Sequence, residues 1–141
     1  MKARRVKKLD PEKPLRKNAR RIVRTRLKEL CSLAEPALDP SAAEAQHDLR
    51  IACKRLRYVL DLVGSCFGEE AGIARDRARE LQTVLGEIHD CDEMLPRAEG
   101  IASLDAFLRT RRELLYRRFV DLWRADSTAA TWEAVERILD D

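Results

Sequence analysis

The residues of this chain best suited to chemistry are charged or ionisable side chains that recur at helical spacing. His47, Arg50, Lys54 and Arg57 are separated by three, four and three positions, which places them in one longitudinal stripe on a helix. The stripe points about 140° away from the apolar seam of the same segment and extends about 15 Å, and Arg55 flanks it. Because arginine suits bidentate hydrogen bonding to phosphate oxygens, the stripe indicates a binding site for a polyanion.

A second basic stripe is expected on the preceding helix. It lies opposite an apolar arc, no acidic residue interrupts it, and its members are Lys17, Arg20, Arg21, Arg24 and Lys28. Like charges three or four residues apart repel by a few tenths of a kcal/mol per pair, so undiluted stripes favour an anionic partner over the simpler alternative of two solvated faces. The charge is also divided along the chain. Residues 1–60 hold 17 Lys and Arg against 7 Asp and Glu, and residues 61–141 hold 11 against 18, which indicates a basic region in the first half of the chain.

Nucleic acid is one alternative ligand for such a region. The basic N-terminal segment and a sequence pI near 8.8 would assist nonspecific binding of DNA or RNA. The net charge of +3 is modest for that role. Aromatic side chains are absent from both stripes apart from Tyr58 nearby, so stacking on single-stranded bases is poorly provided for.

Two His-Asp pairs raise a catalytic alternative. His47-Asp48 and His89-Asp90, with a further Asp downstream, formally offer the ligands of an HD-type metal-dependent phosphohydrolase. The helical wheel places Asp48 well away from the cationic stripe, and the cations around His47 disfavour a divalent metal. We therefore expect no metal site, no cofactor and no catalysis. His47, with an ordinary pKa of about 6.5, would act as an ionisable phosphate ligand.

The composition favours a single all-helical domain. A chain of 141 residues with only five Gly and five Pro, rich in Ala, Leu, Arg and Glu, fits an all-α fold of one domain. Its apolar stretches fall far short of the ~20 residues of a membrane span. No apolar signal segment follows the basic start, so a cytoplasmic protein is expected. Four cysteines without a C-x-x-C pair are expected to be reduced core thiols; they are Cys31, Cys53, Cys66 and Cys91.

The apolar periodicity predicts where the helices lie. It indicates four long helices and a short final one, over residues 15–34, 42–67, 73–95, 102–125 and 129–139. Residues 1–13 lack an apolar pattern and are expected to form a flexible basic arm, so that residues 14–141 form one helical domain. Short connections between helices of similar length favour an antiparallel up-and-down four-helix bundle with a short C-terminal helix.

Two segments resemble a known family. The run HDLRIACKRLRY, residues 47–58, is similar to the H-x-L-R-x-x-x-K/R-R-L-R signature of the CHAD family, the conserved histidine α-helical domain. Leu81-Gln82, followed by LGEIHD at residues 85–90, resembles the later L-Q-x-x-L-G-x-x-x-D element of that family. The resemblance implies an all-helical domain that binds inorganic polyphosphate and is often linked to polyphosphate granules or to triphosphate-processing enzymes.

The resemblance also implies the site and a departure from the usual architecture. By motif position, the anion-binding set is His47, Arg50, Lys54, Arg55 and Arg57, and the stripe of residues 17–28 joins it on wheel geometry alone. A full CHAD domain has two helical bundles facing each other across a basic channel. This chain carries one His-x-x-Arg motif and has about half the usual length. The residues of its motifs are closer to those in the second half of a full domain. Either two chains pair to rebuild the channel or the site is a flatter remnant, and a homodimer is the more economical hypothesis.

Overall fold

The chain folds entirely into helices. The structure, a computed structural model, describes residues 1–141 and contains no strand. Its elements in chain order are α1 (Leu15–Ala37), α2 (Ala43–Val63), η1 (Gly64–Cys66), α3 (Glu69–Met94), η2 (Leu95–Ala98), α4 (Ala102–Arg124) and α5 (Asp126–Asp140). The all-α expectation is confirmed. No helix is both long enough and apolar enough to cross a membrane.

The helix ends differ from the predicted ones for local reasons. Pro36 lies inside the last turn of α1, where its ring removes one backbone N–H donor, and the helix ends one residue later at Ala37. Gly68 adopts a φ of 85°, a left-handed conformation that glycine reaches without steric cost. The chain therefore turns at Gly68 itself, and α3 begins at Glu69, four residues before the predicted start.

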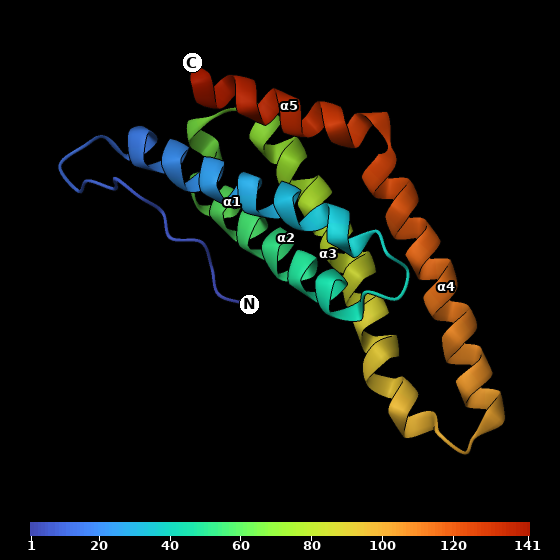
Figure 1. Ribbon diagram of the computed structural model, residues 1–141. Coiled ribbons are helices and arrows are strands. Elements are labelled where there is room, and N and C mark those ends of the chain that lie inside the picture. The colour runs from blue at the N-terminus through green and yellow to red at the C-terminus, as the bar shows by residue number, and fades with distance from the viewer.

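The helices do not confirm a regular up-and-down bundle of four. Helix α2 packs between α1 and α3, α4 packs against α3, and α5 packs on α3 and the end of α4 with a smaller contact to α1. In Figure 1, the end of α3 and the start of α4 project beyond the loop between α1 and α2. Helix α4 thus packs alongside α3 and does not close a bundle around α1 and α2.

The core lies mainly among α1, α2 and α3. Leu27, Leu49, Leu56, Leu81 and Ile88 are each almost fully buried, and burying such a side chain contributes about 1.5–3 kcal/mol. The four cysteines, all expected in the core, differ in how far they are buried. Cys53 and Cys91 are buried, Cys66 is partly buried, and Cys31 is exposed. Burial raises the pKa of the Cys53 and Cys91 thiols.

A buried carboxylate ties α1, α2 and the N-terminal arm together. Glu29 on α1 is only 2% exposed, and its Oε1 accepts a hydrogen bond from Arg55 of α2 at 3.1 Å. Its Oε2 accepts from the backbone N–H of Arg4 at 2.7 Å and from Arg26 at 3.2 Å. Residues 1–13 form no helix, and this carboxylate holds part of the arm, which the sequence predicted to be flexible, against the helices.

A second polar cluster attaches α4. Arg112 donates to Asp92 of α3 at 2.5 Å, to the Pro40 carbonyl at 2.8 Å and to Gln46 at 2.7 Å. Tyr116 donates to the Leu38 carbonyl. Helix α4 is therefore held to α3 and to the α1–α2 loop by directional contacts in addition to apolar packing.

Candidate anion-binding face

The stripe on α2 borders α3. The His47 ring stacks on the His89 ring of α3 with centroids 4.2 Å apart. Arg50 lies against Gly86, where an added Cβ would be 3.2 Å from the Arg50 Nε. These neighbours are two points of one antiparallel register between the helices.

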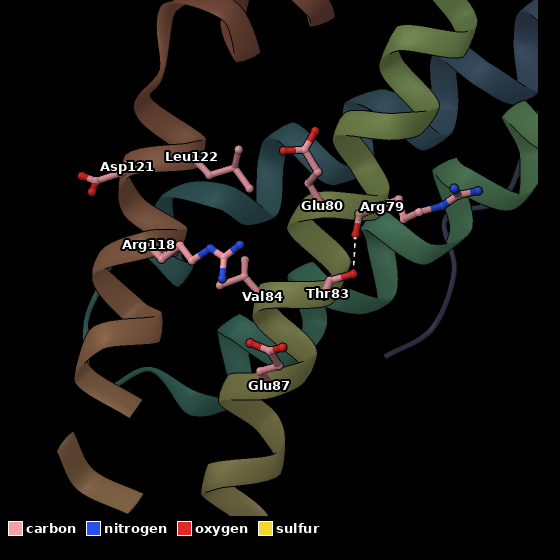
Figure 2. Close-up of a pocket in the computed structure, with 8 residues that line it drawn as sticks. All are labelled: Arg79, Glu80, Thr83, Val84, Glu87, Arg118, Asp121 and Leu122. Atoms are coloured by element: carbon pink, nitrogen blue, oxygen red, sulfur yellow. Dashed lines mark hydrogen bonds between the residues drawn. The ribbon is translucent and has the colours of Figure 1, made fainter. Parts of the chain in front are cut away.

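The same register continues to the other end of the stripe. Asp61 on α2 lies 3.7 Å from Arg75 on α3, so Arg57 stands level with Arg79. Figure 2 shows the Arg79 side chain extending toward α2 and away from Arg118 on α4. We call the surface formed by these side chains the basic face; its members are His47, Arg50, Lys54 and Arg57 of α2 with Arg79 and His89 of α3.

The cations of the α2 stripe have no acidic partner. Arg50, Lys54 and Arg57 take part in none of the ion pairs of the structure. The Nε atoms of Arg50 and Arg57 and the Nδ1 of His47 are buried yet make no hydrogen bond within the protein. Buried polar groups are nearly always hydrogen-bonded, because an unmade bond costs desolvation energy. Arginine side chains that find no acceptor within the protein are suited to an acceptor-rich ligand.

Tyr58 supports two of these cations. The Arg57 guanidinium carbon lies 4.5 Å from the Tyr58 ring centroid, and the Lys54 Nζ lies 5.6 Å from it. Both distances are within the range of cation–π attraction. The single aromatic residue near the stripe therefore orients cations of the α2 stripe instead of offering a stacking platform for bases.

Acidic residues mark both ends of the basic face. Asp61 stands at one end beside Arg75. At the other end, Glu44, Asp92 and Glu93 line a hollow of about 250 Å³ together with the two histidines. The run of basic side chains from His47 to Arg57 is thus about 15 Å long at the rise of an α-helix, which suits a short stretch of a linear anion.

The environment of His47 favours its neutral form when no anion is bound. Burial lowers the pKa of the imidazole, and His89 and Arg50 lower it further through charge repulsion. Asp48 acts in the opposite direction but more weakly. An anion placed on the basic face would oppose the repulsion between these groups.

The other predicted site residues are divided between different surroundings. Arg55 lies on the flank of α2 that faces α1, where it donates to Glu29 and, at 2.9 Å, to the Met1 carbonyl. Arg24 donates to the Leu139 carbonyl at 3.0 Å and pairs with Asp140 of α5 at 2.9 Å. At Arg24, the α1 stripe therefore faces α5 and not the α2 stripe. Arg20 Nε is buried without a partner, and Lys17, Arg21 and Lys28 form no ion pair.

Sequence reasoning missed the contribution of α3. Arg75, Arg79, Gln82, Gly86 and His89 follow at spacings of four, three, four and three, so they share one face of the helix. This spacing is visible in the sequence, but acidic residues on the other faces of α3 offset the positive charge of the segment, so the segment as a whole does not stand out as basic. The sequence suggested a role for His89 only as a metal ligand, whereas in the structure its ring stacks on the His47 ring.

A larger hollow than the one beside the two histidines lies elsewhere on the surface. Between α3 and α4 a cavity of about 490 Å³ is lined by Arg79, Glu80, Thr83, Val84, Glu87, Arg118, Asp121 and Leu122 (Figure 2). The Arg79 guanidinium points out of it, so its acidic side chains outnumber the one cation that remains, Arg118. This charge balance does not suit a polyanion.

The His-Asp pairs do not form a metal-ligating set. No group of three or more His, Cys, Asp or Glu side chains is placed to hold a metal ion. The HD-type alternative therefore has no ligand cluster among the described residues.

Comparison with known proteins identifies one match. A family model described as the CHAD domain matches residues 2–99, which include α1, α2, α3 and the whole basic face. No curated protein and no solved structure was found to match the chain.

Proposed function

Because this chain belongs to the CHAD family, whose domains in general bind polyphosphate, we propose that it holds inorganic polyphosphate on the basic face. The observation that carries the proposal is the state of Arg50, Lys54 and Arg57. They lie along one side of α2 without acidic partners, and the Nε atoms of both arginines are buried without a hydrogen bond. Polyphosphate supplies acceptor oxygens at every unit, and the terminal guanidinium nitrogens of both arginines and the Lys54 ammonium can bind them along the length of the stripe.

The predicted residues take different roles in this proposal. His47, Arg50, Lys54 and Arg57 contact the anion directly, and Arg79 and His89 contribute from α3. Arg55 positions α1 against α2 through Glu29. The α1 residues add to the field that attracts the anion; they are Lys17, Arg20, Arg21, Arg24 and Lys28.

Binding without catalysis fits the chemistry of the basic face. A phosphoryl-transfer site needs a positioned nucleophile or base and a group that stabilises the leaving oxygen. The basic face offers donors and positive charge, and carboxylates lie only at its ends, where Glu93 is 3.5 Å from His89 and Asp61 lies beside Arg75. We propose that the protein acts as a polyphosphate-binding module in the cytoplasm and associates with polyphosphate granules.

A competitive titration tests the ligand. Labelled polyphosphate is displaced from the protein by unlabelled polyphosphate or by duplex DNA of matched charge, over a series of salt concentrations. We expect polyphosphate to compete better throughout. Preference for DNA at moderate salt would favour the nucleic-acid alternative and contradict the proposal.

Charge reversal tests the location. Arg50→Glu combined with Lys54→Glu should abolish binding, while circular dichroism remains that of a helical protein. A matched control is Arg97→Glu with Arg124→Glu, because both are exposed residues away from the basic face and the change in net charge is the same. Binding that survives the first pair, or that is lost equally in the control, would show that the basic face is not the site.

We further propose that two copies assemble around one polyphosphate chain, which would place two basic faces across a two-fold axis. Without the anion, the same pairing would bring like charges together, so the dimer should form only with ligand. Size-exclusion chromatography with light scattering, with and without polyphosphate, measures this. A strict monomer under both conditions would contradict the dimer and leave the binding proposal intact.

A further inference from the structure

A second cluster of cations lies where the N-terminal arm meets α1. Arg5, Lys7 and Lys8 of the arm, with Arg21, Arg24 and Thr25 of α1, line a hollow of about 280 Å³. No acidic or apolar side chain lines this hollow, so its surface carries positive charge and a hydroxyl group only. We call it the arm site.

The arm site is held in place from both sides. On one side, Asn18 donates to the Asp10 carbonyl at 2.7 Å and accepts from the Asp10 N–H at 3.1 Å. On the other, the Arg4 N–H donates to the Glu29 carboxylate at 2.7 Å. The segment from Arg5 to Lys8 is therefore suspended between two anchored points against α1.

The backbone at Lys8 brings neighbouring cations to the same hollow. Lys8 has a φ of 62°, a left-handed conformation that is uncommon for residues with a side chain and is often found at binding sites. In an extended segment, consecutive side chains point to opposite sides. The left-handed residue breaks this alternation, and Lys7 and Lys8 both line the hollow.

Most of these cations are uncompensated. Only Arg24 has an acidic partner, Asp140, at 2.9 Å; Arg5, Lys7, Lys8 and Arg21 have none. Gathering four unpaired cations around one hollow is electrostatically unfavourable unless an anion joins them. Thr25 adds a hydroxyl group that donates to the Arg21 carbonyl.

The arm site is separate from the basic face. Arg24 contacts the C-terminal end of α5, whereas His47 and Arg50 contact α3. Between them lies the α1–α2 contact that Arg55 and Glu29 make. An anion at one site therefore leaves the other accessible.

We propose that the arm site is a second, independent phosphate-binding site and that each molecule holds two polyphosphate segments at once. The identity of the ligand rests on the proposed function, but the existence of the site does not. A molecule with two such sites cross-links long polyphosphate chains, which gives it a way to build a network in addition to binding one chain.

Calorimetric titration with tripolyphosphate tests the two sites separately, because this probe is short enough to occupy one site at a time. At protein concentrations where light scattering shows a monomer in the presence of tripolyphosphate, we expect two tripolyphosphates per wild-type molecule, and one after Arg5→Glu, Lys7→Glu and Lys8→Glu are combined. These three residues are exposed, so the variant should keep its helical circular dichroism. The charge-matched control Lys13→Glu, Arg97→Glu and Arg124→Glu should still bind two.

The reversal of Arg50 and Lys54 separates the two proposals. If it also reduces the stoichiometry from two to one, both stand. If the arm variant loses one site and the Arg50/Lys54 variant loses none, the arm site stands and the proposed function of the basic face fails. A wild type that binds a single tripolyphosphate, or an arm variant that still binds two, overturns the inference.

Light scattering with long-chain polyphosphate tests the cross-linking. Wild-type protein should increase scattering as it is titrated into the polymer, and either reversal should remove the increase. Equal scattering from the arm variant and the wild type would overturn the cross-linking.

Discussion

Arg50 occupies space that exists because residue 86 has no side chain. An added Cβ at Gly86 would lie 3.2 Å from the Arg50 Nε and 3.8 Å from its Cδ. A glycine inside a helix is less stable than alanine by about 0.5–1 kcal/mol. The position thus lowers the stability of α3 while it lets the Arg50 side chain lie close to that helix.

Replacing Gly86 by alanine should separate stability from binding. The helix gains up to about 1 kcal/mol, and the Arg50 side chain must shift by a few tenths of an ångström. We expect an unchanged or higher melting temperature with polyphosphate affinity reduced about 3- to 10-fold, equivalent to about 0.7–1.4 kcal/mol. Thermal unfolding and titration calorimetry measure the two effects.

Gly72 provides the matched control for this substitution. It also lies in α3, and apart from its chain neighbours and the backbone of its own helix, a Cβ added at this position would have no heavy atom within 4 Å. Gly72→Ala should therefore stabilise the helix without a change in affinity. Equal affinities of the two variants would contradict the role given to the Arg50–Gly86 contact.

His47 should make polyphosphate binding depend on pH. Burial, His89 and Arg50 lower its pKa in the free protein, and a bound polyanion favours the charged imidazole. Binding therefore takes up a proton, and affinity should rise as the pH falls from about 7.5 to about 5.5. His47→Gln should flatten this dependence in titrations over the same range, and an identical pH profile in the variant would contradict the assignment.

The same lowered pKa has the opposite effect on the free protein. Below about 6.5 the unfolded chain protonates this histidine before the folded chain does. Folding stability contributed by His47 is therefore present above that pH and is lost as the pH falls toward the lowered pKa. Ligand affinity and intrinsic stability should change in opposite directions over this interval.

At the scale of the elements, the contact between α1 and α2 depends on Glu29. Its carboxylate is 2% exposed and serves Arg55, Arg26 and the arm at Arg4. Glu29→Ala would leave these donors without their acceptor, and the loss of one partner from a buried ion pair costs about 3–5 kcal/mol. Because both arginines are partly exposed, we expect the lower end, about 3 kcal/mol, in urea unfolding.

The arm should respond to the same substitution. Loss of the Arg4 anchor frees residues near the start of the chain, so limited proteolysis within the arm should accelerate. Glu35→Ala is the control, since Glu35 is exposed on α1 and its loss should change stability by less than about 0.5 kcal/mol. Similar unfolding curves for both variants would contradict the anchoring role.

Helical spacing predicted which residues share a face, but not which helix that face meets. The α2 stripe has the alignment expected from its spacing, because i, i+3 and i+4 positions are neighbours on any helix. Its neighbour could not be predicted, since packing depends on how helices are placed in three dimensions. The sequence grouped the α1 stripe with the α2 stripe in one anion-binding set, whereas His47 and Arg50 contact α3.

At the scale of the whole molecule, periodicity predicted an all-helical chain but not its packing. Helix α4 shows why. It buries only Leu108, Leu115 and Phe119, and Phe107 and Leu114 remain 61% and 60% exposed. The spacing of its apolar residues suggested a full partner in a bundle, but α4 contacts mainly α3 and lies along one edge of the molecule.

The central place of α3 determines how the protein opens. Helix α3 packs against α2, α4 and α5, so its middle amides become accessible only when several interfaces separate together. Hydrogen–deuterium exchange should therefore be slowest in α3 and approach the rate set by global unfolding there. Amides of the arm and of the first turns of α4, which meet fewer neighbours, should exchange first. Since α3 forms one side of the basic face, that face should remain intact through the local fluctuations that release the rest of the surface.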